Sequence, residues 1–360
     1  MSLHHTAPAA SPDTQPGVPW PDPQRQAHFG EWLASLPTDL ALQPHTLRPA
    51  SADASFRRYL RIESARGSLV IMDAPPDKED CKPFVQVAQL MQQAGLRVPE
   101  VLAREQSHGF LLLSDLGAKT LLQAMDLAAP PPLEQYLEAT DMLIQWQLAS
   151  KPDVLPPYDS ALLRRELDLF PQWYIAQHRK VTLDEKQAQV LEEAFGRIIE
   201  NNLGWPSVYV HRDFMPRNLM VSPQGLGLLD FQDAVYGPIT YDIASLMRDA
   251  FLTWDEEFCL DVTIRYWQRA RKAGLPVGDD FGTFYQGVEW MGLQRHLKIA
   301  GIFGRLTLRD GKPQYLEDTP RFIHYIRSTC SRYMALKPLL RLVEAIEGIE
   351  VPTAFVFGKF

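Results

Sequence analysis

The sequence predicts an α+β protein of two lobes, a small β-rich lobe followed by a larger and mostly helical one. Strand-like runs occur before Gly117, whereas helical periodicities dominate after it. The length of 360 residues is enough for two lobes that share a cleft. We therefore expect an N-terminal lobe over residues 24–116 and a C-terminal lobe over residues 117–360.

The first lobe begins after a segment, residues 1–23, that is rich in Pro and Ala and has no periodicity, so we expect it to be disordered. Phe29, Trp32, Leu33 and Leu36 then predict a short amphipathic helix. "SFRRYLRIESARGSLVIMDAPP" predicts two strands joined by a turn at residues 64–67. "PFVQVAQLMQQAGL" predicts a helix, and "VPEVLAREQSHGFLLLSDLG" predicts two further strands.

The second lobe is predicted to be helical with a few short strands. The expected helices lie near residues 133–149, 159–179, 183–202, 240–252, 255–273, 280–303 and 319–346. The expected strands are Val208–His211, Leu219–Val221 and Leu226–Leu229. This order of elements is typical of a protein-kinase-like fold.

Charge and composition exclude several classes of function. The formal net charge of −8 argues against a nucleic-acid or membrane-surface binder, because either needs a broad basic face. No apolar run approaches the length of a membrane span, and the amino terminus lacks the pattern of a secretion signal. We expect a cytoplasmic monomer without a nucleic-acid or membrane partner.

One stretch, "VYVHRDFMPRNLMVSPQGLGLLDFQDAVYGP", carries the chemistry. Phosphoryl transfer from ATP needs a carboxylate that accepts the proton of the attacking hydroxyl, and oxygen ligands for Mg²⁺. Asp213 supplies a base, and Asn218, five residues later, supplies a neutral metal ligand from the same loop. The following hairpin returns Asp230 beside Asn218 as a charged metal ligand.

"HRDFMPRN" and "LDFQDA" resemble the catalytic loop and metal-binding segment of the aminoglycoside-phosphotransferase and choline-kinase family. The resemblance implies that Asp213 is the catalytic base and that Asn218 and Asp230 hold Mg²⁺. Asp242 resembles the family's buried structural aspartate, which ties the catalytic loop to a helix. For His211 we favour a packed scaffold over a proton shuttle, and for Arg212 a structural salt bridge.

The N-terminal lobe departs from the protein-kinase pattern in two places. It lacks G-x-G-x-x-G, and "SADASF" stands there instead, where the hydroxyls of Ser51 and Ser55 could donate to phosphates. The strand "SLVIMDAP" has Met72 or Asp73 where a phosphate-binding lysine is expected. The candidates for the missing positive charge are Arg57, Arg58 and Lys82, and the sequence does not choose among them. Arg58 is the one that we include in the predicted nucleotide site.

The segment "LLLSDLG" resembles a hinge that binds adenine through backbone groups. The predicted nucleotide residues there are Leu113, Ser114, Asp115 and Leu116. The missing lysine leaves one alternative of another class, a pseudokinase that binds nucleotide or a partner without catalysis. The complete set of base and metal ligands argues against it.

"SADASFRRYLRIE", "VIMDAPP", "DFQDAVYGPITYDIASLMRDA" and "GLQRHLKIAGIFGRL" resemble one bacterial branch of the family. Its members phosphorylate the anomeric hydroxyl of N-acetylmuramate and N-acetylglucosamine during cell-wall recycling. The resemblance implies an amino-sugar kinase. The alternative is a kinase of another small alcohol, such as an aminoglycoside, choline or a homoserine-like compound.

Between Gln286 and Arg327 the chain has seven Lys or Arg against four Asp or Glu, a local surplus of positive charge in an acidic chain. Such a surplus suits a substrate with a carboxylate, like the lactyl group of N-acetylmuramate, better than a polycation. Helix 284–303 is apolar on two faces, so its polar residues need partners. The substrate is one possible partner and internal carboxylates are the other. The predicted substrate residues are Asp213, Arg217, Trp290, Gln294 and Arg295.

Overall fold

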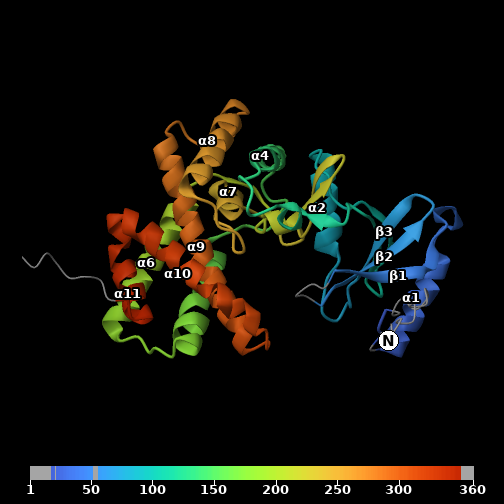
Figure 1. The fold of residues 1–360 in the computed structure, drawn as a ribbon, viewed down its shortest axis with the longest axis horizontal. Coiled ribbons are helices and arrows are strands. Elements are labelled where there is room, and N and C mark those ends of the chain that lie inside the picture. Colours follow the sequence, from blue (N-terminus) through green and yellow to red (C-terminus); the bar gives the residue numbers. More distant parts are fainter. Residues whose placement is uncertain (1–17, 21, 52–55, 350–360) are drawn as a thin grey trace, which may run out of the picture. The chain divides into compact units, whose positions relative to one another are not determined.

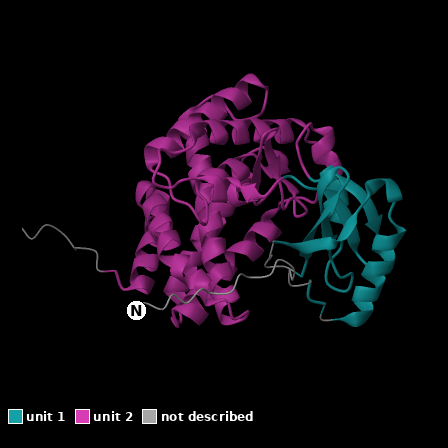
Figure 2. Cartoon of the chain, turned by 45° about the vertical axis from the view of Figure 1, so that its right-hand side comes forward, with its two compact units in different colours: residues 1–88, 99–116 teal, residues 89–98, 117–360 magenta. Residues whose placement is uncertain are grey.

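The computed structural model describes residues 18–20, 22–51 and 56–349, with only the backbone for Ser51, and they form two compact units (Figures 1 and 2). Unit 1, teal in Figure 2, contains the described residues up to Ala88 and Pro99–Leu116. Unit 2, magenta, contains Gln89–Val98 and the described residues from Gly117 onward. Ser55 and most of the segment 1–23 lie outside the described residues.

Unit 1 is built on an antiparallel sheet with the strand order β1-β2-β3-β5-β4. Its strands are β1 (Gln43–Ser51), β2 (Arg58–Ser64), β3 (Gly67–Asp73), β4 (Val101–Glu105) and β5 (Phe110–Ser114). β1 is missing from the sequence prediction, since Pro44 and Pro49 interrupt it. Its place at the edge of the sheet explains this, because an edge strand has one side without ladder hydrogen bonds and tolerates proline there.

Helix α1 (Pro23–Ser35) covers one face of this sheet. Asp22 caps the helix by accepting a hydrogen bond from the backbone N–H of Gln24 (2.9 Å). Alternate strand residues point to the same face, so β2, β3 and β5 each present two apolar side chains to the helix. The resulting core contains Phe29, Trp32, Leu40, Leu60, Ile62, Leu69, Ile71, Phe110 and Leu112. The 3₁₀ turn η1 (Thr38–Leu40) follows α1, and α2 (Lys82–Gln93) follows β3 and crosses from unit 1 into unit 2.

Unit 2 is mostly helical, as predicted, and α9 (Phe281–Leu308) packs against seven other helical elements, η2, α10, α7, η4, α6, α5 and α8, whose bounds are given below (Figure 1). Helix α9 is buried on every face along most of its length, which agrees with its apolar pattern. The other helical elements are α3 (Leu121–Ala124), α4 (Leu133–Leu148), α5 (Ser160–Leu167), η2 (Phe170–His178), α6 (Glu185–Leu203), α7 (Thr240–Met247), α8 (Glu256–Lys272), η4 (Pro313–Asp318), α10 (Thr319–Arg332), η5 (Met334–Leu336) and α11 (Lys337–Glu347).

The single helix predicted for residues 319–346 is wrong. The chain leaves the helical conformation at Tyr333 (φ −115°, ψ 122°) and starts again as α11, with Pro338 in its first turn. Proline suits a helix start because its missing N–H has no intrahelical partner there. Pro171 likewise lies in the first turn of η2, a wider π-type helix that follows α5 inside the predicted helix 159–179.

Two small sheets in unit 2 hold the segment that carries the sequence motif. β7 (Ser207–Val210) pairs antiparallel with β10 (Val235–Pro238), a strand absent from the prediction. β6 (Lys119–Thr120), β8 (Leu219–Ser222) and β9 (Gly225–Leu228) form the other sheet. The motif residues therefore lie in two loops, 211–218 and 229–234, and each loop runs from one of these sheets to the other.

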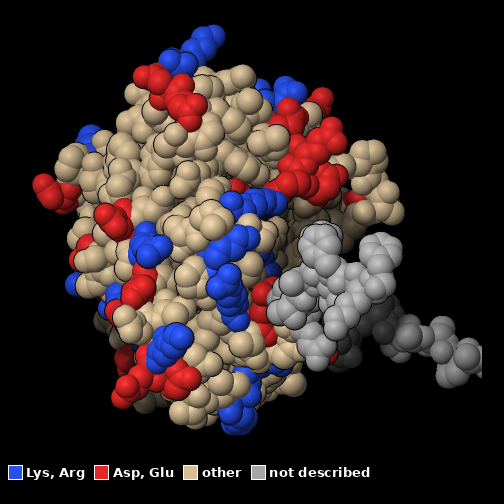
Figure 3. All heavy atoms as spheres, turned by 90° about the vertical axis from the view of Figure 1, so that its left-hand side faces the viewer, with Lys and Arg blue, Asp and Glu red and all other residues tan. Residues whose placement is uncertain are grey.

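The described surface carries both signs of charge. In Figure 3, basic side chains run down the middle of the face shown and clusters of acidic side chains lie around them. No continuous basic patch covers the described part of that face. Among the helices of the described residues, none combines the length and the apolar character that a membrane span requires.

Candidate active site

The β7–β8 loop, which carries Asp213 and Asn218, is hydrogen-bonded to the start of the β9–β10 loop, which carries Asp230. The amide nitrogen of Asn218 donates to the backbone carbonyl of Asp213 (2.8 Å). The backbone N–H of Leu229, the residue before Asp230, donates to the carbonyl of Asn218 (2.9 Å). Asn218 thus links the loop of Asp213 to the segment of Asp230.

His211 is a buried scaffold residue in this loop. Its Nδ1 accepts a hydrogen bond from the backbone N–H of Asp213 (3.2 Å), and its Nε2 lies 3.0 Å from the carbonyl of Leu229. Only the neutral ring with hydrogen on Nε2 satisfies both contacts. Burial lowers the pKa of His211 to about 4, which favours the same neutral form. This geometry favours the scaffold interpretation over the proton shuttle.

Asp242, in the first turn of α7, fixes the start of the loop. Its carboxylate accepts the backbone N–H groups of His211 (2.7 Å) and Arg212 (3.0 Å), and the residue is fully buried. Burial raises the pKa of Asp242 to about 7, while the two backbone donors and Arg295 act in the opposite direction. The contacts are those expected of a structural aspartate that ties the loop to a helix.

Arg212 and Asp230 both have left-handed backbones, with φ of 77° and 62°. Such angles are uncommon for residues other than glycine and occur often at functional sites, where surrounding contacts hold them. Arg212 directly precedes Asp213, so its conformation sets the direction in which Asp213 leaves the chain.

A buried carboxylate, Glu166 of α5, lies behind the loop. It accepts hydrogen bonds from Arg212 (2.6 Å) and from Lys298 (2.8 Å) and Gln294 (3.0 Å) of α9, and also from the hydroxyl of Tyr158. Burial alone would raise the pKa of Glu166, but Lys298 and Arg212 lower it to about 2, so the group is ionised at neutral pH. The sequence prediction for Arg212, a salt bridge, describes its contact here, but Glu166 itself was missed because a glutamate on an amphipathic helix has no distinctive motif.

Asn218 and Asp230 have the donor chemistry that Mg²⁺ prefers. Because the Asn218 nitrogen faces Asp213, its Oδ1 is the atom that can face a cation. Asp230 accepts a hydrogen bond from Gln232 (2.8 Å), which orients its carboxylate. No group of three or more His, Cys, Asp or Glu among the described residues could hold a metal by itself. This fits Mg²⁺, which typically takes one or two protein ligands and completes its shell with substrate phosphates and water.

Three of the predicted substrate residues on α9 are buried and contact other parts of unit 2. Gln294 donates to Glu166, and Arg295 donates to the carbonyl of Arg212 (2.7 Å) and lies over the ring of Tyr241 (4.9 Å). Trp290 belongs to the hydrophobic core of unit 2. These contacts favour the internal alternative for the polar residues of this helix.

Arg217, a predicted substrate residue on the same loop as Asp213, has a different environment. It is exposed, stands four residues after Asp213, and holds its guanidinium 4.6 Å from the ring centre of Phe251. The described residues include no acidic partner within ion-pair distance of it. Arg217 is thus an exposed cation on the loop of residues 211–218.

In unit 1, Arg58, which we included in the predicted nucleotide site, contacts a carboxylate. Arg58 donates to Asp73 at the end of β3 (2.9 Å) and to the carbonyl of Pro19 (2.7 Å). Arg57 lies 3.4 Å from Glu79. Lys82, at the start of α2, is exposed and has no acidic partner within ion-pair distance among the described residues. The geometry therefore shifts our preference from Arg58 to Lys82.

The hinge residues of the sequence prediction lie at and just beyond the end of β5. Leu113 pairs with Val70 of β3, the Ser114 hydroxyl accepts the N–H of Glu100 (2.8 Å), and Leu116 is buried. Asp115 forms an ion pair with Arg61 (2.6 Å). These side chains are thus engaged within unit 1, so any adenine contact here would use backbone groups. Of the two predicted phosphate hydroxyls, Ser51 is described by its backbone alone and Ser55 not at all.

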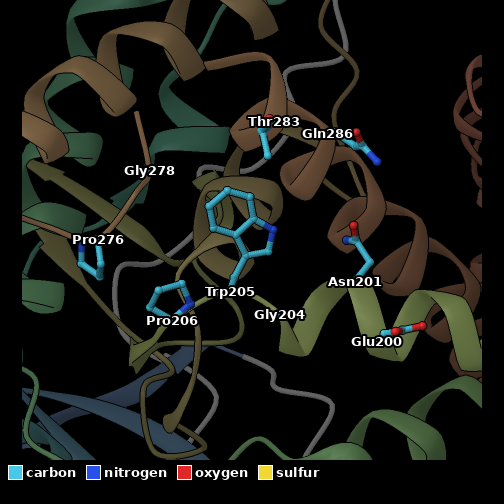
Figure 4. Close-up of a pocket in the computed structure, with 9 residues that line it drawn as sticks. All are labelled: Glu200, Asn201, Gly204, Trp205, Pro206, Pro276, Gly278, Thr283 and Gln286. Carbon is cyan, nitrogen blue, oxygen red and sulfur yellow. The ribbon is translucent and has the colours of Figure 1, made fainter. Parts of the chain in front are cut away.

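Unit 2 also has an open pocket of about 640 Å³ (Figure 4). In Figure 4 the indole of Trp205 lies in the middle of the lining residues, with Pro206 beside it. Both residues precede β7, whereas the catalytic loop follows that strand. The lining residues are Glu200, Asn201, Gly204, Trp205, Pro206, Pro276, Gly278, Thr283 and Gln286. None of the predicted site residues lines this pocket.

Comparisons with known proteins agree on the kind of protein this is. The sequence profile of the phosphotransferase enzyme family matches residues 46–278. An N-acetylmuramate/N-acetylglucosamine kinase of Neisseria meningitidis is 46% identical over 338 residues, which cover 93% of this chain and 100% of the relative. A kinase of the same name from Pseudomonas aeruginosa is 47% identical and covers 91% of this chain and 99% of the relative.

Solved structures share the fold at low sequence identity. An ADP-bound aminoglycoside phosphotransferase matches with a TM-score of 0.58 and 14% identity, over 84% of this chain and 97% of the other. A choline/ethanolamine kinase family protein from Mesorhizobium loti matches with a TM-score of 0.60 and 14% identity, over 89% and 99%. The predicted kinase-like fold, with a β-rich part and a larger helical part, is confirmed.

Proposed function

The chain belongs to the phosphotransferase enzyme family, and from that membership we propose that it phosphorylates the anomeric hydroxyl of N-acetylmuramate and N-acetylglucosamine with ATP. The observation that carries the substrate is the 46% identity, over nearly the whole chain, to a relative named for these two sugars. The reaction class is supported independently by the joining of Asp213, Asn218 and Asp230 in one site. Such an activity serves peptidoglycan recycling, which takes place in the cytoplasm.

In this proposal Asp213 orients the sugar hydroxyl and accepts its proton as the phosphoryl group is transferred. Asn218 and Asp230 hold Mg²⁺, which neutralises charge on the nucleotide phosphates when bound. His211, neutral and hydrogen-bonded at both nitrogens, keeps the backbone of Asp213 in place without exchanging a proton. Lys82, Ser51 and Ser55 are the proposed phosphate contacts, and residues 113–116 the proposed adenine contact.

The lactyl carboxylate distinguishes the two sugars, and we assign its recognition to Arg217. This cation is exposed on the catalytic loop and its guanidinium is held in place by Phe251. Arg295 is less suitable because it is buried and already donates to the carbonyl of Arg212. A charge-assisted hydrogen bond to Arg217 would favour N-acetylmuramate without affecting the features that both sugars share.

Two other functions are alternatives that the assay described below would distinguish. The fold neighbours include aminoglycoside and choline kinases, so another small alcohol is the alternative acceptor. A pseudokinase that binds nucleotide without transfer is the other. The surplus of positive charge between Gln286 and Arg327 argues against a polycationic acceptor.

A phosphorylation assay over N-acetylmuramate, N-acetylglucosamine, choline and an aminoglycoside tests the proposal. We expect transfer to the two amino sugars and a product that has lost its reducing end. The methyl glycoside of N-acetylglucosamine is the matched control, because it has the same ring and acetamido group but a blocked anomeric hydroxyl. Phosphorylation of the methyl glycoside would contradict the anomeric position, and transfer only to choline or the aminoglycoside would contradict the sugar. The Asp213→Asn variant, prepared in parallel, excludes activity from a contaminating kinase.

A further inference from the structure

The residue that precedes the proposed catalytic base is held in a conformation it would not adopt alone. Arg212 has a φ of 77°, which places its Cβ too close to its own carbonyl oxygen. A left-handed conformation is strained for a residue other than glycine and persists where the surroundings enforce it. The contacts of Arg212 should therefore show what enforces it.

The backbone N–H, the backbone carbonyl and one guanidinium nitrogen of Arg212 have partners, and each partner comes from a different helix. Its N–H donates to Asp242 of α7 (3.0 Å), and its carbonyl accepts from Arg295 of α9 (2.7 Å). Its guanidinium donates to Glu166 of α5 (2.6 Å). Two contacts hold the backbone, and Glu166 supplies the ion pair that holds the side chain.

Glu166 is itself fixed by groups other than Arg212. One carboxylate oxygen accepts from Tyr158 and Gln294 (3.0 Å), and the other accepts from Lys298 (2.8 Å) as well as Arg212. The residue is 5% exposed. Because Lys298 and Gln294 both belong to α9, the carboxylate would keep its place if the loop moved.

We propose that Glu166 is a positioning residue of the phosphoryl transfer: it fixes the guanidinium of Arg212 and so aims the carboxylate of Asp213. The anion that contacts this loop is part of the chain and is buried. The role of Asp213 rests on the proposed function. The ordering of Arg212 by Glu166 rests only on the contacts above.

The competing explanation is that Glu166 merely neutralises buried cations, in which case it affects stability alone. Lys298 separates the two explanations. Lys298→Met removes a cation from the same carboxylate but leaves Tyr158 and Gln294 to hold Glu166 against Arg212. Glu166→Gln instead removes the charge of the ion pair with Arg212. Both changes disturb the same buried cluster, so both should lower the melting temperature.

The first measurement compares kcat and the two KM values of Glu166→Gln and Lys298→Met. We expect Glu166→Gln to lower kcat about ten- to a hundredfold, because small displacements of a catalytic group have effects of that size. Both KM values should stay within about twofold. Lys298→Met should keep kcat within about threefold of wild type despite its lower melting temperature.

The second measurement uses the backbone of residue 212. Glycine adopts a φ of 77° without strain and alanine does not, so Arg212→Gly should retain a higher kcat than Arg212→Ala. In the Arg212→Gly background, Glu166→Gln should change kcat less than about threefold, because no guanidinium is left to hold. This double-mutant comparison isolates the coupling between the two residues.

Two results would overturn the proposal. One is an equal loss of kcat in Glu166→Gln and Lys298→Met. The other is the same fold-loss from Glu166→Gln whether residue 212 is arginine or glycine. If the wild-type protein phosphorylates neither amino sugar, the proposed function fails instead, and the same kcat comparisons apply to the acceptor that the panel identifies.

Discussion

Two buried carboxylates, Asp73 in unit 1 and Glu166 in unit 2, make similar ion pairs in different surroundings. Asp73 accepts hydrogen bonds from Arg25 of α1 (2.8 Å) and Arg58 of β2 (2.9 Å). Glu166 accepts them from Arg212 (2.6 Å) and from Lys298 of α9 (2.8 Å). Each carboxylate thus compensates two cations, and each side chain is nearly excluded from solvent, with 1% and 6% exposed.

The two carboxylates differ in the structural elements that carry their cationic partners. Both partners of Asp73 are on regular elements, α1 and β2, which the hydrophobic core of unit 1 already holds in place. One partner of Glu166 is on an irregular loop whose backbone is strained. The same interaction therefore stabilises a fold in unit 1, and in unit 2 it also orients a loop. Removal of Asp73 should change stability, and removal of Glu166 should change stability and turnover.

The largest expected loss of kcat is that of Asp213→Asn, and the loss in Glu166→Gln should not exceed it. Asp213→Asn should lower kcat by ~10²–10⁴-fold while nucleotide affinity is retained, because loss of a positioned base has that effect. Steady-state kinetics with direct nucleotide titration would measure it. Turnover of Asp213→Asn within a few-fold of wild type would show that Asp213 is not the base. If kcat fell less in Asp213→Asn than in Glu166→Gln, Glu166 would do more than orient Asp213.

Asp73→Asn tests the unit 1 half of the comparison. It leaves Arg25 and Arg58, whose side chains are 16% and 32% exposed, near a neutral group. We expect a loss of unfolding free energy between the ~1 kcal/mol of an exposed pair and the roughly 3–5 kcal/mol of a fully buried one. We expect kcat of the folded protein, at saturating nucleotide, to remain near the wild-type value.

The matched control for this change is Asp39→Asn. Asp39 pairs with Arg66 at 3.3 Å, and both side chains are more than half exposed, at 67% and 62%. Loss of an exposed pair should cost less than ~1 kcal/mol. Denaturant unfolding measures both variants. A loss of kcat in Asp73→Asn as large as that in Glu166→Gln would remove the distinction between the two carboxylates.

The third prediction separates the two arginines of unit 2 that were expected to meet the substrate. Arg217→Met should lower kcat/KM for N-acetylmuramate about ten- to a hundredfold more than for N-acetylglucosamine. The reason is that a lost charge-assisted bond is worth roughly 1.5–3 kcal/mol. Arg295→Met should harm both sugars in parallel and lower the melting temperature, because the carbonyl of Arg212 loses its donor.

Arg309→Met is the control for this pair, because Arg309 is exposed and its ion-pair partner is the adjacent Asp310. It should affect neither sugar. Selective loss of N-acetylmuramate in Arg295→Met, with Arg217→Met unselective, would return the carboxylate to Arg295.

The smallest expected effect is a loss of folding stability at low pH, which should arise from buried histidines of unit 2. Burial lowers the pKa of His211 to about 4 and that of His296 to about 3, both below the ordinary value of 6.5. The unfolded chain therefore binds more protons below pH 6.5, and each histidine removes up to ~1.4 kcal/mol of stability per pH unit as the pH falls toward 4. Asp242 and Asp249 act in the opposite direction, since burial raises their pKa values to about 7 and about 6.

Melting temperatures of His296→Asn and wild type between pH 7 and 4.5 measure the histidine contribution. The variant should lose less stability with acid than wild type, although it is less stable at pH 7. His45→Asn, an exposed position in unit 1, should follow the wild-type curve. Parallel curves for His296→Asn and wild type would show that His296 does not titrate between the two states.

Much of the site could be predicted from the sequence because its residues lie in two adjacent loops. Asp213, Asn218 and Asp230 are linked across a short hairpin, and the spacing alone brings them together. Periodicity and turn residues likewise predicted most strands of unit 1 and most helices of unit 2. These features depend on neighbours within about 20 residues, so the local sequence determines them.

Other features depend on contacts between distant residues, and only the tertiary structure decided them. β1 is a strand because β2 offers it an edge, although its own residues favour no strand. Arg58 meets Asp73, Arg295 meets the carbonyl of Arg212, and Glu166 meets Arg212 across 46 residues. A charged side chain can pair with any opposite charge that the fold brings near it, so its sequence position alone does not specify its partner. The sequence therefore determined which residues we propose for the chemistry, and the packing of α5, α7 and α9 decided what holds them in place.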